Sequence, residues 1–139
     1  FGLLPRFVRM YGTPEGLDFT APIKGARIRS YFGTREDRMH WGVDYEARAG
    51  TDILAPEEGL VVYCGERGEY GFVIDIDHGG GFVSRLTHCE DVQVELHQRV
   101  FRGEKVAALA PLADATAGKP HLHYELLIDG VPHNPVPYL

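Results

Sequence analysis

Three consecutive segments of strand character, separated by glycine-containing turns, constrain the fold of this chain more than any other feature. Residues 60–65 (LVVYCG), 71–78 (GFVIDIDH) and 82–89 (FVSRLTHC) are rich in β-branched and aromatic side chains, and the run GGG at 79–81 separates the last two. Short segments of this composition that are joined by tight turns are typical of antiparallel strands. The pattern therefore predicts a three-stranded meander.

The same strand pattern recurs along the rest of the chain. Residues 26–33 (ARIRSYFG) and 40–47 (HWGVDYEA) alternate in character, and turns are expected at residues 102–103 and 129–130. The 17 glycines and 9 prolines suit short strands, and no segment has a convincing amphipathic helical pattern. We therefore expect one all-β domain, mostly antiparallel, whose sheet is closed or sandwiched so that its edges are protected.

The first residues predict a separate lead-in to this domain. Residues 6–11 (RFVRMY) and 17–22 (LDFTAP) flank the turn-rich segment GTPEG at 12–16. Two strand-like segments around such a turn favour a hairpin. We accordingly expect residues 1–24 to form a strand or hairpin that packs on a domain over residues 25–139.

Net charge and hydropathy argue against two functions, nucleic-acid binding and crossing a membrane with an apolar segment. The net charge of −6 argues against a nucleic-acid binder, which needs a basic face. No apolar run is long enough to span a membrane. The chain begins with Phe1 rather than Met and carries no visible signal peptide. We expect a mature or trimmed piece, and the missing leader does not indicate residence in the cytoplasm.

Two histidines stand one residue apart in KPHLHYE, at residues 119–125. The following residues read as a strand, and alternate side chains of a strand share a face, so His121 and His123 are expected to point the same way. Two imidazoles on one face either bind a metal ion together, or one binds it while the other works beside it. A metal site would need further ligands from elsewhere in the chain.

The segment HWGVD offers those ligands, because His40 and Asp44 lie four residues apart and Gly42 lets the backbone bend between them. Taken alone, this spacing is a weak signal, because chance matches are frequent, and an Asp44 that caps a turn would be the better interpretation. Together with one histidine of the later pair, it makes two nitrogens and one oxygen, which with an open fourth position is typical of a catalytic zinc site.

The cysteines do not supply a closed structural zinc site. Cys64 and Cys89 are too far apart for a Cys-x-x-Cys motif. They form one disulfide or stay free, and we favour free thiols.

The other histidines have simpler interpretations. His78, His97 and His133 stand among turn or polar residues, which is typical of histidines without a metal. His88 ends a predicted strand, where it is either a buried polar residue or part of the site.

Together, HWGVDYEARAGT (40–51) and KPHLHYE (119–125) resemble the lysostaphin-type, or LytM-domain, zinc metalloendopeptidases that cut peptidoglycan. The resemblance extends to SYFGTR (30–35), to YGFVIDIDHGGGFVSRLTH (70–88) and to the C-terminal GVPHNPVPYL (130–139). It thus covers nearly the whole chain, and the two histidine motifs in this order are highly specific. A cupin-like barrel, in which the His-x-His pair comes first, and a Ser-His-Asp hydrolase, which lacks its Gly-x-Ser-x-Gly elbow here, are disfavoured.

The resemblance implies a role for each residue of the site. His40, Asp44 and His123 would hold Zn2+, and His88 and His121 would be catalytic histidines that do not bind the metal. It also implies a LytM-like single domain of mostly antiparallel strands, with a groove across the sheet that holds the metal.

The implied activity is hydrolysis of peptide bonds in peptidoglycan by metal-activated water, outside the cytoplasm, in the periplasm or cell envelope. The implied partners are a peptidoglycan peptide and a regulatory N-terminal region or partner protein, and a monomer is expected. The alternative is a non-catalytic LytM-like domain that binds the wall or regulates another wall hydrolase.

Some residues bear on this resemblance individually. Glu125 shares the strand face of His123 and is either the acceptor for the second N–H of that histidine or a solvent-facing charge. Leu86 stands where the family often has an aromatic residue, and His97 where a turn glycine is common. In the segment before His121, the family usually has glycine or similarly small residues where this chain has Ala110, Ala113 and Lys119.

Overall fold

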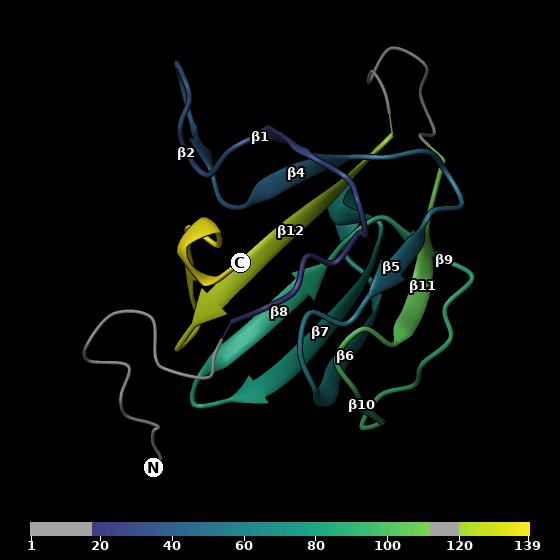
Figure 1. The fold of residues 1–139 in the computed structure, drawn as a ribbon. Helices are drawn as coiled ribbons and strands as arrows, with labels where there is room; N and C mark the ends of the chain where they lie inside the picture. The colour runs from purple at the N-terminus through teal and green to yellow at the C-terminus, as the bar shows by residue number, and fades with distance from the viewer. Residues whose placement is uncertain (1–17, 112–119) are drawn as a thin grey trace.

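A main sheet of eight strands organises the fold, with strand order β1-β4-β12-β8-β7-β6-β10 and β13 paired to β12 (Figure 1). The computed structural model describes residues 18–111 and 120–139. The strands of this sheet are β1 (Ile28–Ser30), β4 (Val43–Glu46), β6 (Gly59–Glu66), β7 (Phe72–Gly79), β8 (Phe82–Leu86), β10 (Arg99–Val100), β12 (His121–Ile128) and β13 (Val131–His133). Every pairing within it is antiparallel, which confirms the predicted fold class.

Two smaller sheets complete the described architecture. One is a three-stranded sheet of order β5-β11-β9, and the other is a two-stranded hairpin, β2-β3, which projects from the body in Figure 1. Their strands are β5 (Asp52–Leu54), β11 (Lys105–Leu109), β9 (Cys89–Glu90), β2 (Gly33–Thr34) and β3 (Met39–His40). The described residues also form two short 3-10 turns, η2 (Gly68–Tyr70) and η4 (Val136–Tyr138).

The structure contains the predicted three-stranded meander and both predicted turns. Strands β6, β7 and β8 form the expected meander, and turns at residues 102–103 and 129–130 connect β10 to β11 and β12 to β13. His97 has a backbone φ of +72°, which explains why a glycine suits its position.

The strand predicted over residues 17–22 is wrong for residues 18–22, the part of it that the structure describes. The backbone N–H of Phe19 donates to the carbonyl oxygen of Tyr138, whereas that of Thr20 donates to the carbonyl oxygen of Pro56. Because neighbouring residues bond to two different segments, no ladder with a single partner strand forms. The other half of the expected hairpin, residues 6–11, lies outside the described residues, and the division at residue 24 stays a prediction.

The main core lies between the eight-stranded sheet and the β5-β11-β9 sheet, because its buried side chains come from both. Leu122 and Tyr124 of β12 point into it and are fully buried. Each buried side chain of this size contributes roughly 1.5–3 kcal/mol of hydrophobic stabilisation. The alternate residues His121, His123 and Glu125 therefore lie on the opposite face of β12, away from this core.

Cys64 and Cys89 are free thiols, as we expected. Within residues 18–111 and 120–139, no helix has the length and apolar character that crossing a membrane requires. Ala113 and Lys119 lie outside the described residues.

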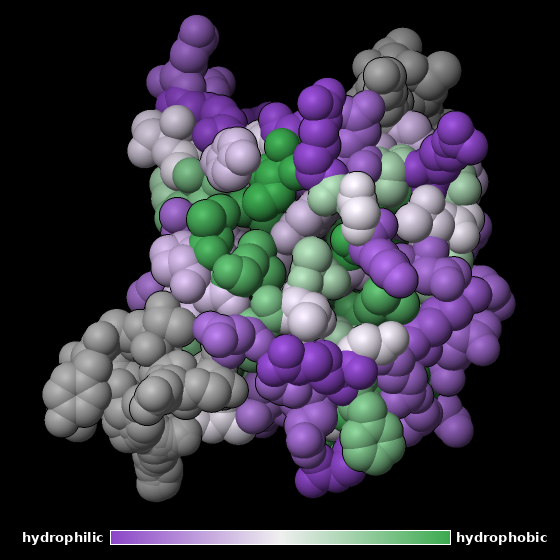
Figure 2. Space-filling view, viewed as in Figure 1, coloured by the Kyte–Doolittle hydropathy of each residue, from purple (hydrophilic) through white to green (hydrophobic). Residues whose placement is uncertain are grey.

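The face of the molecule in Figure 2 is largely hydrophilic, and its hydrophobic atoms gather over the C-terminal turn. Val136 and Leu139, in and next to η4, are about 40% exposed. The projecting β2-β3 hairpin is strongly hydrophilic in the same view.

Gly42 allows a close approach between the β3-β4 connection and β12. A Cβ atom at this position would lie 2.2 Å from the carbonyl oxygen of Tyr124 and 3.0 Å from the Cγ atom of Glu125. We predict that Gly42→Ala lowers the free energy of unfolding by about 1–3 kcal/mol, because backbone must shift to relieve this overlap. Urea denaturation measures the change.

Gly65→Ala is the matched control, since a Cβ at this strand glycine would find its nearest atom 3.5 Å away, in the side chain of Tyr63. Its effect is expected to stay within about 0.5 kcal/mol. Equal stability losses in both variants would contradict a specific close approach at Gly42.

Candidate metal centre

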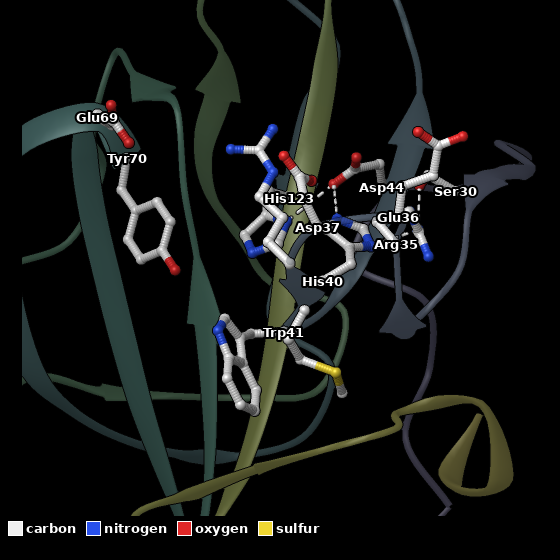
Figure 3. A pocket seen from close by; sticks show the side chains of 12 residues that line it. Ser30, Arg35, Glu36, Asp37, His40, Trp41, Asp44, Glu69, Tyr70 and His123 are labelled. Carbon is white, nitrogen blue, oxygen red and sulfur yellow. Dashed lines mark hydrogen bonds and ion pairs between the residues drawn. The ribbon is translucent and has the colours of Figure 1, made fainter.

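His40, Asp44 and His123 converge at one point on the sheet face that points away from the main core (Figure 3). Each offers one ligand atom, and the three atoms lie within 4.8 Å of one another. The Oδ1 atom of Asp44 lies 2.8 Å from Nδ1 of His123 and 3.3 Å from Nε2 of His40. The convergence follows from strand pairing, because His123 on β12 is directly opposite Asp44 on β4.

The remaining ring nitrogens identify which atoms are available to a metal. Nδ1 of His40 lies 2.8 Å from the carbonyl oxygen of Tyr31 and 2.9 Å from Nη2 of Arg35, and Nε2 of His123 lies 2.9 Å from Oε2 of Glu125. When each of these nitrogens donates its N–H to its oxygen, the other nitrogen of the ring has a free lone pair. Nε2 of His40, Nδ1 of His123 and a carboxylate oxygen of Asp44 then face one point, and this donor set fits a zinc ion.

Glu125 is a buried acceptor rather than a solvent-facing charge, since it is only 1% exposed. Its Oε2 atom accepts from His123 and, at 2.5 Å, from the hydroxyl of Tyr70, and its Oε1 atom accepts from Nη1 of Arg85 at 3.2 Å. Arg85 donates two further hydrogen bonds to the carboxylate of Asp75, at 3.0 and 3.1 Å. The two carboxylates and the guanidinium occupy opposing positions on β7, β8 and β12, so sheet register alone places them in a row.

Electrostatics make this site attractive to a cation. Burial raises the pKa of Asp44, but the hydrogen bond and charge of His123 and the charge of His40 outweigh burial and hold the pKa below its usual value. The pKa of Glu125 is likewise lowered, because His123, Tyr70 and Arg85 outweigh the effect of burial. Burial lowers the pKa of His123, yet its bonds to the two carboxylates raise it to about 9. Two ionised carboxylates therefore flank His123 and favour a proton on each of its nitrogens, and a metal ion at Nδ1 would take the place of one of these protons.

His88 and His121 form a second pair, with ring centroids 5.7 Å apart. His121 precedes His123 by two residues on β12, and His88 follows β8. The backbone φ of His88 is +54°, which is an uncommon and strained conformation for a non-glycine residue. Its N–H donates to the carbonyl oxygen of Tyr70 at 2.9 Å, and its carbonyl oxygen accepts from Ala110 at 2.8 Å. Both backbone groups of His88 are thus held in place.

The two histidines of this pair differ in their surroundings. Nη2 of Arg29 donates to Nδ1 of His121 at 2.9 Å. Because a guanidinium can only donate, the neutral His121 ring carries its proton on Nε2. Burial lowers the pKa of His88, and the charges of His121 and His123 lower it further against an opposing effect of Asp44. His88 is therefore neutral near pH 7 and is able to accept a proton.

A cleft of about 820 Å³ opens beside the three converging residues. One wall is the charged loop that joins β2 to β3, and the other includes η2. The cleft is lined by Ser30, Arg35, Glu36, Asp37, Arg38, Met39, His40, Trp41, Asp44, Glu69, Tyr70 and His123. This lining gives the expected groove, although neither His88 nor His121 is part of it.

Sequence reasoning missed several residues that support the site. Arg35 donates to Oγ of Ser30 at 2.6 Å and to the carbonyl oxygen of Tyr31, so it holds the segment on which the His40 ring rests. Tyr70 and Arg85 contact Glu125. A charged residue inside the strand pattern of residues 82–89 was the available signal for Arg85, but its partners depend on strand register.

Comparisons with known proteins agree with this geometry. The DD-carboxypeptidase/endopeptidase Mpg of Neisseria meningitidis is 34% identical over 121 residues, which cover 83% of this chain and 27% of Mpg. A crystal structure of a peptidase M23 from Pseudomonas aeruginosa has a TM-score of 0.77 and 30% identity, over 91% of this chain and 52% of that one. A zinc-containing peptidase from Vibrio cholerae has a TM-score of 0.73 and 25% identity, over 84% and 39%.

The chain thus spans little more than a quarter of the length of the Mpg relative.

A family model also matches the part of the chain that contains both histidine motifs. The model described as Peptidase family M23 matches residues 38–135, a range that contains all three converging residues and both further histidines. This chain belongs to peptidase family M23.

Proposed function

We propose that this protein is a zinc metalloendopeptidase that hydrolyses peptide bonds in the cross-links or stem peptides of peptidoglycan. The observation that carries the proposal is the convergence of His40, Asp44 and His123 beside an open cleft. Three protein ligands with a free position are typical of catalytic rather than structural zinc. The substrate class is supported by the names of two relatives from Vibrio cholerae, which are peptidoglycan DD-endopeptidases. A peptidoglycan substrate would require a location outside the cytoplasm, in the periplasm or cell envelope.

A zinc ion held by His40, Asp44 and His123 would supply the positive charge that lowers the pKa of a bound water molecule to about 7 and that polarises the scissile carbonyl group. His88, which is neutral and only partly buried, accepts the proton that the attacking water loses. His121, with its proton held on Nε2 by Arg29, donates a hydrogen bond to the carbonyl oxygen as negative charge develops there. His40, Asp44 and His123 hold the ion, and Glu125 keeps His123 oriented toward it.

The alternative, a non-catalytic domain that binds the wall or regulates another hydrolase, has no specific support from the described residues. A domain with that role does not need three converging ligands, yet all three are present here. His88 and His121 are also both retained beside them.

Metal analysis combined with digestion tests the function. We expect one Zn2+ per chain, and we expect defined muropeptides to be cut at a peptide bond, with fragments identified by mass spectrometry. A chelator should abolish cleavage and added Zn2+ should restore it. Intact muropeptides after incubation with the zinc-loaded protein would instead support the non-catalytic alternative.

Two histidine substitutions test the division of roles. His123→Ala is expected to abolish both zinc binding and hydrolysis, because it removes a ligand. His121→Ala should leave zinc bound but lower turnover by roughly 10²–10⁴-fold, the usual contribution of a group that handles protons. Zinc content and the rate of muropeptide cleavage are the measurements, and loss of the metal in His121→Ala would refute the assignment.

Glu125→Gln tests the support behind His123. The substitution keeps the shape of the side chain but removes the negative charge of the carboxylate, which accepts hydrogen bonds from His123, Tyr70 and Arg85. Zinc affinity should therefore fall by about 10–100-fold. Competition with a coloured chelator measures the affinity. Glu66→Gln, which neutralises an exposed carboxylate at the end of β6, is the control and should bind zinc as the unmodified protein does.

A further inference from the structure

Tyr70 contacts both the metal-ligand group and the second histidine pair. It is the last residue of η2, between β6 and β7, and it lines the cleft. Figure 3 shows its side chain on the opposite side of His123 from Asp44. Its side chain contacts Glu125 and His123, whereas its backbone carbonyl contacts His88.

The side chain holds His123 in two ways. The ring of Tyr70 stacks on the ring of His123, with centroids 5.4 Å apart and planes inclined by 28°. The hydroxyl donates to Oε2 of Glu125, the same atom that accepts from Nε2 of His123. One carboxylate oxygen thus ties the phenol to the imidazole, and the stacked rings limit how far either one can rotate.

The backbone of the same residue holds His88. The carbonyl oxygen of Tyr70 accepts the N–H of His88, which has the strained φ of +54°. Gly71 packs next to the His88 ring, since a Cβ there would lie 3.6 Å from Nδ1 of His88. The turn is closed by hydrogen bonds of its own, from the N–H of Tyr70 to Arg67 and from that of Gly71 to Gly68.

A role in the core does not account for Tyr70. No residue of η2 is buried, and neither hydrophobic core cluster of the described residues includes Tyr70. Its phenol instead donates to a carboxylate that is 1% exposed and that contacts a predicted metal ligand.

We infer that Tyr70 is a positioning residue, which sets the zinc ligand His123 and the proton-accepting His88 at a fixed separation. The inference rests on the proposed zinc peptidase function. It adds a residue that contacts both the proposed metal ligand His123 and the proposed proton acceptor His88. Side-chain contacts orient the ligand, and the backbone contact orients the base. A change in the phenol should therefore alter metal affinity as well as turnover.

Three variants of the full 139-residue chain separate these contributions. Tyr70→Phe keeps the stacked ring but loses the hydroxyl, and Tyr70→Leu loses both. Tyr63→Phe is the matched control, because the hydroxyl of Tyr63 also makes one hydrogen bond, to the carbonyl oxygen of Glu66 at 2.9 Å, but lies outside the cleft lining. Circular dichroism confirms that each variant is folded.

The primary measurement is zinc affinity by chelator competition, which does not depend on any cleavage. We expect Tyr70→Phe to weaken zinc binding by about tenfold and Tyr70→Leu by up to about 100-fold, the range for outer partners of a ligand. Tyr63→Phe should bind as tightly as the unmodified protein. In muropeptide cleavage, Tyr70→Phe should lower kcat without raising KM, because orientation rather than substrate binding is lost.

Unchanged or tighter zinc binding in a folded Tyr70→Phe variant would overturn the inference while leaving the proposed function intact. An equal loss in Tyr63→Phe would also overturn it, since the effect would then be general. If the unmodified protein binds zinc but cuts no muropeptide, the proposed function fails, and the affinity comparison still tests Tyr70 as a support of the metal ligand.

Discussion

The pairing of β4 with β12 is the interaction on which the site depends. It sets His123 directly opposite Asp44, residues that are 79 positions apart in the chain, and leaves both side chains on the face away from the main core. Gly42 allows the preceding segment to lie against the backbone of Tyr124, which brings His40 to the same point. A slip of one residue in this pairing would turn the proposed ligands toward the core and the core residues toward the cleft.

Behind the proposed ligands, a row of buried charges on β7, β8 and β12 limits how these side chains can rearrange. Removing an ion from water costs several kcal/mol unless partners compensate, and a lone carboxylate at Glu125 would be unfavourable. Arg85, Tyr70 and His123 each donate to Glu125, and Asp75 accepts two further hydrogen bonds from Arg85. The orientation of His123, the proposed metal ligand, thus depends on a network spanning β7, β8 and β12.

The sequence predictions were right where interactions between nearby residues determine the structure, and they failed where residues far apart in the chain interact. The β6-β7-β8 meander and the turns at residues 102–103 and 129–130 were predictable, because glycine and strand-forming residues act over a few positions. The strand expected at residues 17–22 was wrong for its described part, since distant segments around Pro56 and Tyr138 take its hydrogen bonds. The burial of Glu125 was left as one of two alternatives, because register decides which neighbours surround it.

By itself, the sequence determined the all-β class, the hairpin turns and the types of metal ligand available, since composition, alternation and motif spacing are local properties. The sharing of one face by His121, His123 and Glu125 also follows from the alternation of a strand. Only the tertiary structure decided that Tyr70, Arg85 and Asp75 form the network behind His123, the proposed metal ligand, and that Arg29 contacts His121. The physical reason is that strand pairing and register bring distant residues together, and neither is encoded in any single segment.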